Sequence, residues 1–181
     1  MDGKVIVDTQ TMYKTLARLS HEIIEKNADC ENVLLIGIKR RGVSLARIIK
    51  ENIEKFSQMK VDLREIDITL YRDDLTERYN SPKLNRKPDE MSVDGRTVVL
   101  VDDVIYTGRT ARAAMEAIIN MGRPATIQLA VMIDRGHREL PINPNYVGKN
   151  IPTSKEEQVK VKVDEYDGIT EVVLSKKGNQ A

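Results

Sequence analysis

Apolar residues recur along the chain at two different spacings, and these spacings predict alternating helices and strands. One face of residues 8–26 is apolar at helical spacing, and Asp8 or Thr9 can serve as the N-cap. The unbroken apolar run 33–38 instead predicts a strand that is buried on both faces. The same reasoning predicts helices over about 43–53 and 109–121, the latter closed by Gly122 and Pro124, and strands over 61–70, 97–101 and 126–133.

Strands that alternate with helices form a mainly parallel sheet with helices on both faces, so we expect an α/β fold. In such folds, ligands bind beyond the carboxyl ends of the strands. The polar stretch 71–92, which contains Pro82 and Pro88, interrupts the alternation. A loop of this length within a compact domain is either functional or a disordered insertion, and both interpretations are open at this point.

The composition favours one soluble domain, 1–181, in a reducing compartment. The longest apolar stretch is far too short to span a bilayer, and the start of the chain lacks the layout of a secretory signal. Cys30 is the single cysteine and cannot form an internal disulfide, so we expect a cytoplasmic location. The net charge of +1 predicts no general attraction to nucleic acid or membranes, so any polyanion site must be a local patch.

The segment 98–110, VVLVDDVIYTGRT, joins a strand, two carboxylates and a small-residue loop that opens a helix. Backbone N–H groups at a helix start point the same way and carry partial positive charge, so residues 106–110 can hold a phosphate. Gly108 allows close approach of the ligand, and the hydroxyls of Thr107 and Thr110 can donate hydrogen bonds. The loop therefore predicts a site for a phosphate monoester.

Asp102 and Asp103 directly follow the predicted strand, which places them at its carboxyl end. Their oxygens can accept hydrogen bonds from two adjacent hydroxyls, such as those of a ribose. A simple turn and a response-regulator site with acidic metal ligands are the alternatives. The phosphate loop that follows favours the ribose interpretation. The sequence contains neither a P-loop nor a dinucleotide-binding fingerprint.

The run 98–110 resembles the diphosphate-sugar-binding motif of type I phosphoribosyltransferases. The resemblance implies their fold, a central and mainly parallel sheet flanked by helices, with a small hood and a long flexible lid loop. It also implies that Asp102 and Asp103 are catalytic and bind the ribose hydroxyls of 5-phosphoribosyl 1-diphosphate (PRPP). The residues that would hold its 5-phosphate are Tyr106, Thr107, Gly108, Arg109 and Thr110.

The segment 37–42, GIKRRG, follows the first buried strand, where the family keeps its diphosphate loop. By this resemblance Lys39, Arg40 and Arg41 bind PRPP, and the two arginines also act in catalysis. A solvated basic turn is the alternative. Many members have a non-proline cis peptide in this loop, so we look for one here.

The reaction that the resemblance implies breaks the bond between the anomeric carbon and diphosphate. Positive charge develops on the ribose and negative charge on the leaving group, and both need stabilisation. Mg²⁺ would bridge oxygens of the diphosphate and the ribose, with no protein residue assigned as a direct ligand. The loop 71–92 would be the lid that excludes water, with Tyr71, Arg72 and Asp73 at its base.

Over residues 5–174 the chain is most similar to the family of bifunctional pyrimidine operon regulators and uracil phosphoribosyltransferases. The segments 65–75, 131–141 and 148–154 carry this resemblance. It implies that uracil and PRPP react to form UMP and diphosphate. It also implies that residues 134–158 form a hood that covers the base. The residues implied to contact the base are Asp134, Arg135, Tyr146 and Val147.

A hypoxanthine or other purine phosphoribosyltransferase without an RNA role is the alternative. Purine-using relatives carry an acidic residue at the position of Tyr106, where it serves in proton transfer to the purine, and another at the position of Thr153. Both acids are missing here. The sequence therefore disfavours a purine substrate.

Members of the regulator family also bind the leader of the pyrimidine (pyr) operon mRNA when UMP or UTP is present. This binding regulates the operon by transcription attenuation or translational repression. The locally basic stretch 122–155 supports an RNA surface in part, because clustered cations attract phosphates. For Arg18 and His21 the alternative is an ordinary solvated helix face, and for His137 it is a structural hydrogen bond. The candidate RNA contacts are Arg18, His21, His137, Arg138 and Lys149.

The polar tail 175–181 is expected to fray. Family members assemble as dimers that can pair further, so the resemblance implies a homodimer or a higher homo-oligomer. Such a dimer would join two basic patches into a longer platform for RNA.

Overall fold

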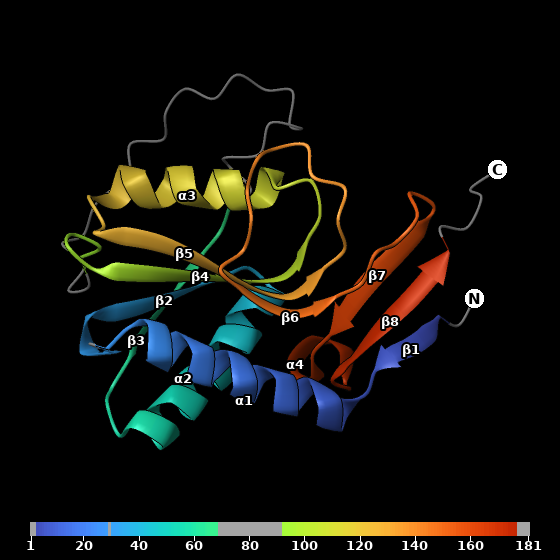
Figure 1. Ribbon diagram of the computed structural model, residues 1–181, viewed down its shortest axis with the longest axis horizontal. Helices are drawn as coiled ribbons and strands as arrows, with labels where there is room; N and C mark the ends of the chain where they lie inside the picture. Colours follow the sequence, from blue (N-terminus) through green and yellow to red (C-terminus); the bar gives the residue numbers. More distant parts are fainter. Residues whose placement is uncertain (1–2, 29, 69–91, 177–181) are drawn as a thin grey trace.

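A five-stranded parallel sheet forms the centre of the molecule (Figure 1). The structure is a computed structural model, and it describes residues 3–28, 30–68 and 92–176. The strands of this sheet are β2 (Val33–Ile38), β3 (Asp62–Ile66), β4 (Thr97–Ile105), β5 (Thr126–Asp134) and β6 (Tyr146–Asn150). They lie in the order β3-β2-β4-β5-β6, and each neighbouring pair is parallel. Their carboxyl ends therefore meet at one edge.

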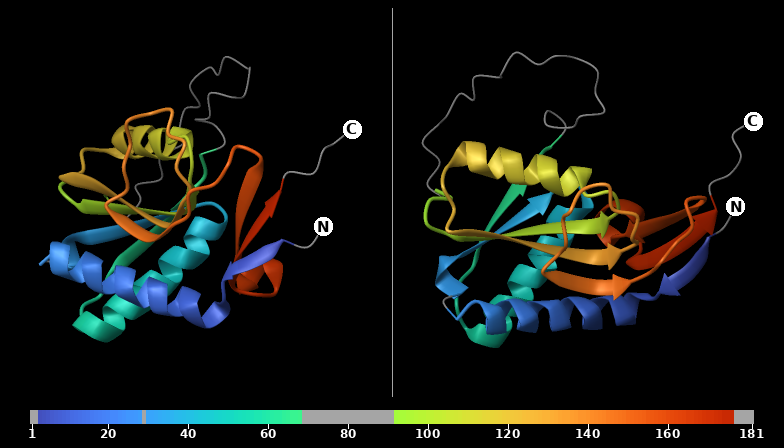
Figure 2. Two further views of the ribbon diagram at one scale, coloured as in Figure 1. Left: turned by 45° about the vertical axis from the view of Figure 1, so that its right-hand side comes forward. Right: turned by 45° about the horizontal axis from the view of Figure 1, so that its top comes forward.

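Helices cover both faces of this sheet. The helices α1 (Thr9–Lys26) and α2 (Arg41–Ser57) pack on one face, and α3 (Arg109–Met121) packs on the other (Figures 1 and 2). Successive side chains of a strand point to opposite faces, so each central strand contributes to two cores. In β4, Val99 and Val101 pack with α1 and α2, whereas Val98 and Leu100 pack with α3. This explains the unbroken apolar runs and confirms the predicted α/β fold.

A smaller antiparallel sheet lies beside the carboxyl ends of the main strands (Figure 2). Its strands are β1 (Lys4–Val7), β8 (Glu171–Lys176) and β7 (Glu157–Lys162), in that order. The short helix α4 (Asp164–Asp167) joins β7 to β8. Val161 and Val172 are fully buried in the same core as α1, so this sheet is anchored to the main one. Ser175 and Lys176, which the sequence assigned to a frayed tail, instead end β8, and residues 177–181 lie outside the described residues.

Three boundaries follow local signals in the sequence. Asp8 caps α1, because its carboxylate accepts a hydrogen bond from the Thr11 amide at 2.7 Å. Hydrogen bonding by Thr11 lowers the pKa of the Asp8 carboxyl group. The helix α3 has the predicted bounds, since Gly108 precedes it and Gly122 follows it. No side chain caps the start of α2, which begins at Arg41 and runs to Ser57, longer at both ends than predicted.

The strand β4 is longer than predicted, and this changes where the carboxylates lie. It continues to pair with β5 as far as Ile105 and Asp134. Asp102 and Asp103 therefore lie inside the last part of β4 and not in a turn after it. The predicted hood, 134–158, also contributes β6 to the edge of the main sheet.

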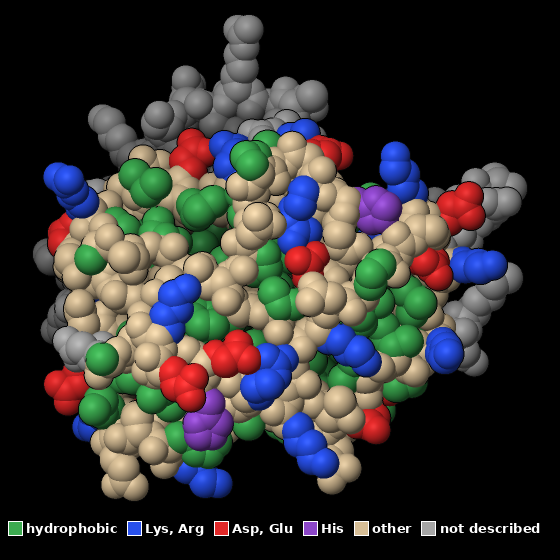
Figure 3. Space-filling view, in the orientation of Figure 1, with side chains coloured by type: hydrophobic (Ala, Val, Ile, Leu, Met, Phe, Trp, Pro, Cys, Tyr) green, Lys and Arg blue, Asp and Glu red, His purple; other side chains and the backbone are tan. Residues whose placement is uncertain are grey.

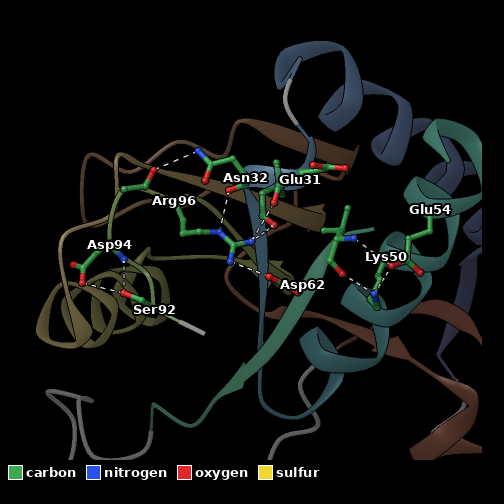
Figure 4. A network of polar contacts seen from close by, with 11 residues as sticks. Glu31, Asn32, Lys50, Glu54, Asp62, Ser92, Asp94 and Arg96 are labelled. Atoms are coloured by element: carbon green, nitrogen blue, oxygen red, sulfur yellow. Dashed lines mark hydrogen bonds and ion pairs between the residues drawn. The ribbon is translucent and has the colours of Figure 1, made fainter. Parts of the chain in front are cut away.

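Arg96 joins the amino-terminal ends of three strands (Figure 4). Its guanidinium donates to the carbonyls of Glu31, Asn32 and Val33, at 3.4, 3.3 and 2.9 Å, around the short 3-10 helix η1 (Cys30–Asn32) and the start of β2. It also pairs with Asp62 of β3 at 2.8 Å. These bonds hold the starts of β2, β3 and β4 in line, opposite the edge that carries the site. No described helix has the length and apolar character needed to cross a membrane.

Candidate active site

The carboxyl-terminal part of β4, the middle of β5 and the amino terminus of α3 line a cavity of about 240 Å³. The predicted phosphate loop forms most of its wall. Asp102 lies on one side of the cavity, and the apolar side chains of Leu129 and Val131 form another part of the wall. The residues that line it are Asp102, the run 104–111, Leu129 and Val131. The structure thus brings a carboxylate and the loop together as predicted.

The loop between β4 and α3 is built to expose backbone N–H groups. Gly108 has a φ of +92°, a backbone conformation that is unfavourable for residues with a side chain. It immediately precedes α3. The first N–H groups of a helix have no partner within the helix. They carry partial positive charge and lie at the cavity wall, so they can bind the oxygens of an anion.

Asp102 and Asp103 are adjacent in β4 and partly buried; Asp102 lines the cavity, and Asp103 lies within reach of the charge of Arg41. Burial raises the pKa of Asp102 well above its ordinary value, and the neighbouring charge of Asp103 raises it further. Burial also raises the pKa of Asp103, while the charge of Arg41 opposes this rise. Two carboxylates held in this way favour a cationic or hydroxyl-rich ligand, because both kinds of ligand stabilise their negative charge.

The predicted diphosphate loop follows β2 beside these carboxylates. The peptide bond between Lys39 and Arg40 is cis. Lys39 and Arg40 are exposed, and Lys39 pairs with Glu65 at 3.2 Å. A Cβ atom at Gly42 would lie 2.4 Å from the carbonyl oxygen of Val101, so only glycine lets the start of α2 approach β4 this closely.

Arg41 is held by a residue that the sequence did not single out. Its Nε and Nη2 atoms donate to the two carboxylate oxygens of Asp167, at 3.1 and 2.9 Å. Asp167 belongs to α4, far along the chain from Arg41. No local pattern in the sequence could connect the two residues, because the contact depends on how the small sheet packs beside α2.

Within the predicted base-binding region, Tyr146 lies in a different environment from the one we expected. Its side chain is only 3% exposed and lies in the core with α1. The Tyr146 hydroxyl donates to Gln128 at 2.6 Å and accepts from Asn27 at 3.1 Å. The structure therefore gives this ring a role in packing, which differs from the predicted contact with the base. Val147 points to the opposite face and packs with the α3 core.

Arg135 connects Tyr106 and Thr153. It is 6% exposed, and its Nε donates to the hydroxyl of Thr153 at 3.1 Å. Its guanidinium lies over the ring of Tyr106, 4.1 Å from the centroid. The backbone carbonyls of Ser154 and Glu157 accept its Nη2 hydrogen bonds, at 3.3 and 2.8 Å.

The segment after β5 is fastened to the phosphate loop. The amides of Glu139 and Leu140 both donate to the carbonyl of Thr107, at 3.0 and 3.1 Å. Arg109 donates to the carboxylate of Glu139 at 2.8 Å. The Arg109 side chain is thus turned toward this segment, while its backbone lies at the start of α3.

Arg138, a predicted RNA contact, is largely engaged inside the same segment. It pairs with Asp134 at 2.5 Å and donates to the carbonyls of Ile142 and Tyr106, at 2.9 and 3.0 Å. The side chain is 18% exposed. The structure therefore favours a structural role for Arg138 over a contact with RNA.

The other predicted RNA residues are exposed. Arg18 pairs with Glu22 and donates to the carbonyls of Val147 and Gly148, which places it against β6 beside Lys149. The ring of His21 stacks on Phe56, with the centroids 4.2 Å apart. Figure 3 shows histidine, lysine and arginine side chains on one face, with acidic residues between them.

Two further predictions concern the lid loop and the binding of a metal ion. The predicted lid, 71–92 with Tyr71, Arg72 and Asp73, lies outside the described residues except for Ser92. Within 3–28, 30–68 and 92–176, no group of three or more His, Cys, Asp or Glu side chains could hold a metal ion. Among the described residues that line the cavity, Asp102 is the one carboxylate, and Asp103 is its neighbour in β4.

Comparisons with known proteins give one consistent family. The family model of the phosphoribosyl transferase domain matches residues 2–166. Bifunctional protein PyrR of Clostridium novyi (strain NT) is 54% identical over 173 residues, which covers 96% of this chain and 97% of that protein. Bifunctional protein PyrR of Halalkalibacterium halodurans is 51% identical over 177 residues, covering 97% of this chain and 98% of that protein.

Solved structures share the fold at low identity. The hypoxanthine phosphoribosyltransferase of Trypanosoma cruzi is 17% identical with a TM-score of 0.73, and 97% of each chain is covered. A hypoxanthine phosphoribosyltransferase from Staphylococcus aureus is 15% identical with a TM-score of 0.71, covering 99% of this chain and 96% of that one. These likenesses confirm the type I phosphoribosyltransferase fold and bear on the fold alone.

The variant Asp102→Asn should stabilise the ligand-free protein at neutral pH, by about 0.5–2 kcal/mol. The folded state raises the pKa of Asp102 above its ordinary value of 3.8, so the wild type loses stability as the pH rises from that value through the raised pKa. Asparagine does not ionise, so its advantage should grow over this window and then level off. Urea unfolding from about pH 4 to about pH 8 measures it.

Asp164→Asn, at an exposed carboxylate of α4, is the matched control for the loss of one negative charge. It should not reproduce the growing advantage. If Asp102→Asn were no more stable than the wild type at neutral pH, the carboxylate of Asp102 would not be held at an energetic cost.

Proposed function

Because the chain belongs to the phosphoribosyltransferase family, and within it to the family of the PyrR bifunctional proteins, we propose that it transfers the phosphoribosyl group of PRPP to uracil. The products are UMP and diphosphate. The observation that carries the proposal is the cavity in which Asp102 faces the phosphate loop at the start of α3. A ribose 5-phosphate presents a diol and a phosphate, which match these two parts of the wall.

The 5-phosphate binds the loop 106–110. The N–H groups at the start of α3 and the hydroxyls of Thr107 and Thr110 donate to its oxygens. Asp102 and Asp103 accept hydrogen bonds from the two ribose hydroxyls. Their negative charge also stabilises the positive charge that develops on the ribose ring, and it acts strongly because both are partly buried.

The diphosphate binds at the start of α2, where Lys39, Arg40 and Arg41 surround its negative charge. PRPP would bind as its magnesium complex, and the ion would supply charge neutralisation on the leaving diphosphate. The carboxylates of Asp102 and Asp103 suit such a complex, because both are partly buried and burial raises the pKa of both, so a nearby cation would favour their ionised forms. As the bond from the anomeric carbon to diphosphate breaks, its electron pair leaves with the diphosphate, and a uracil ring nitrogen forms the new bond and loses its proton.

The base is a pyrimidine. Tyr106 and Thr153 occupy the positions at which purine enzymes carry acids, and Arg135 contacts both of them. An acid that could protonate a purine ring nitrogen is therefore replaced here by a neutral pair around one cation. Asp134, Arg135 and Val147 remain the proposed residues of the base site, with the segment 71–92 as its lid.

Uracil and PRPP with Mg²⁺ should yield UMP, and hypoxanthine should be used about a hundredfold less efficiently or worse. The variant that combines Asp102→Asn and Asp103→Asn should lose activity by about a hundredfold or more, because both charges that stabilise the cationic ribose are gone. Chromatographic detection of UMP and IMP measures both results. Absence of any product with either base would contradict the enzymatic role and leave a nucleotide-sensing regulator.

We further propose that the protein binds the leader of the pyr operon mRNA when UMP or UTP occupies this site. The observation that favours this role is that the exposed Arg18 lies against β6, where it donates to the carbonyls of Val147 and Gly148, next in sequence to the exposed Lys149. Arg18, His21, His137 and Lys149 are the proposed contacts of this RNA-binding face. A homodimer or a higher homo-oligomer would join such faces, and regulation would follow by attenuation or translational repression.

UMP should strengthen binding of a pyr leader transcript, as measured by fluorescence anisotropy over a range of salt concentrations. Lys149→Gln should weaken binding and reduce the slope of log affinity against log salt by about 0.7–0.9, the loss of one phosphate contact. Lys60→Gln, beside β3 at the opposite edge of the sheet, is the matched control. A Lys149 variant with the wild-type slope would remove this face from the proposed RNA site.

A further inference from the structure

Two acidic residues of α4 join the small sheet to the first turns of α2. Asp167 binds Arg41 through two hydrogen bonds, at 3.1 and 2.9 Å. Glu165 binds Arg47 at 2.8 Å and also accepts from the hydroxyl of Ser44. Both contacts dock the same pair of elements, but only Asp167 reaches the cations proposed to bind diphosphate. The two residues therefore differ in what else their contacts can do.

Asp167 holds Arg41 by one edge of its guanidinium. The Nε and Nη2 atoms face Asp167, whereas Nη1 makes no hydrogen bond to any residue within 3–28, 30–68 and 92–176. The Arg41 side chain is 30% exposed, and its charge acts on Asp103 in the site. The free edge of the fork can thus bind an oxyanion while the other edge stays in place.

Asp167 is itself held firmly. The backbone amide of Val163 donates to its Oδ2 atom at 3.1 Å, and Lys160 lies 3.7 Å from its Oδ1 atom. Its side chain is only 11% exposed. A long arginine side chain loses rotamer freedom when it binds a ligand, and a fixed partner removes that loss before the ligand arrives.

We propose that Asp167 is a positioning residue for the leaving diphosphate: it fixes the Arg41 guanidinium so that the free edge is aimed at the ligand. The inference rests on the proposed function, because that function places diphosphate at Arg41. It adds a residue from the small sheet to a site otherwise built on the main sheet.

Two effects of Asp167 on diphosphate binding oppose each other, and the position of Arg41 decides between them. The negative charge of Asp167 repels an anion, so its removal alone would strengthen binding. Loss of the fixed partner releases Arg41 and weakens binding. Because Asp167 is already paired with Arg41 and lies near Lys160, much of its charge is compensated, so we expect the loss of order to dominate.

The test is calorimetric titration of the full chain with magnesium diphosphate and with magnesium PRPP. Asp167→Asn should weaken both affinities by about threefold to tenfold, the effect of freeing one long side chain. Glu165→Gln is the matched control, because it removes an equal charge and a docking contact from the same helix without touching Arg41. It should leave both affinities unchanged.

A double-mutant cycle separates positioning from general docking. In an Arg41→Ala background, Asp167→Asn should cause no further loss of diphosphate affinity, because there is no guanidinium left to fix, and removal of the repulsive charge can only strengthen binding. Asp167→Glu keeps the charge but moves the carboxylate, so it should recover part of the affinity and serves if Asp167→Asn does not fold. An equal loss with and without Arg41, or no loss in any variant, would overturn the inference.

The readout also distinguishes this inference from the proposed function. Diphosphate titration does not require that uracil be accepted as a substrate. A wild type that binds diphosphate but makes no UMP would sink the proposed activity, and the cycle would still decide the role of Asp167. In an active enzyme, Asp167→Asn should raise the KM for PRPP and leave the KM for uracil unchanged.

Discussion

The parallel pairing of β4 with β2 on one side and with β5 on the other is the constraint on which the site depends. Parallel strands end at the same edge of a sheet, so whatever follows each strand is brought together there. The edge receives the cations after β2, the carboxylates at the end of β4 and the fastened segment after β5. Two apolar cores, one on each face, hold this register, because a slip by one residue would turn every strand side chain to the wrong face.

Uncompensated charge is concentrated at this edge. Asp102 and Asp103 lie inside a strand, where burial disfavours their ionised forms. Arg41 offsets part of this charge, and Asp167 in turn binds Arg41. The site is therefore a chain of alternating charges that runs from β4 through α2 to α4. A ligand with a diol, a cation and a diphosphate would complete it.

The fold was largely predictable from the sequence, because its signals are local. The helix 109–121, which Gly122 and Pro124 were predicted to close, has these bounds as α3, and the buried run of β2 was predicted correctly from its unbroken apolar character. The start of α2 was not predicted correctly, because no side chain caps it. The full length of β4 was also not predicted, because the pairing that extends it to Ile105 depends on its neighbour β5. In the site, the predicted phosphate loop does line a cavity with Asp102, whereas Tyr146 lies in the core and Asp167 was missed. Both of these depend on contacts between residues far apart in sequence.

A crystal structure of the protein with UMP would test the central claim most directly. The account predicts the phosphate of UMP within hydrogen-bond distance of the amides at the start of α3, and the ribose hydroxyls against Asp102 and Asp103. The uracil ring should lie on the side of Arg135. A nucleotide bound away from the end of β4, or bound with its phosphate at Lys39, Arg40 and Arg41 and its ribose away from the carboxylates, would contradict the account.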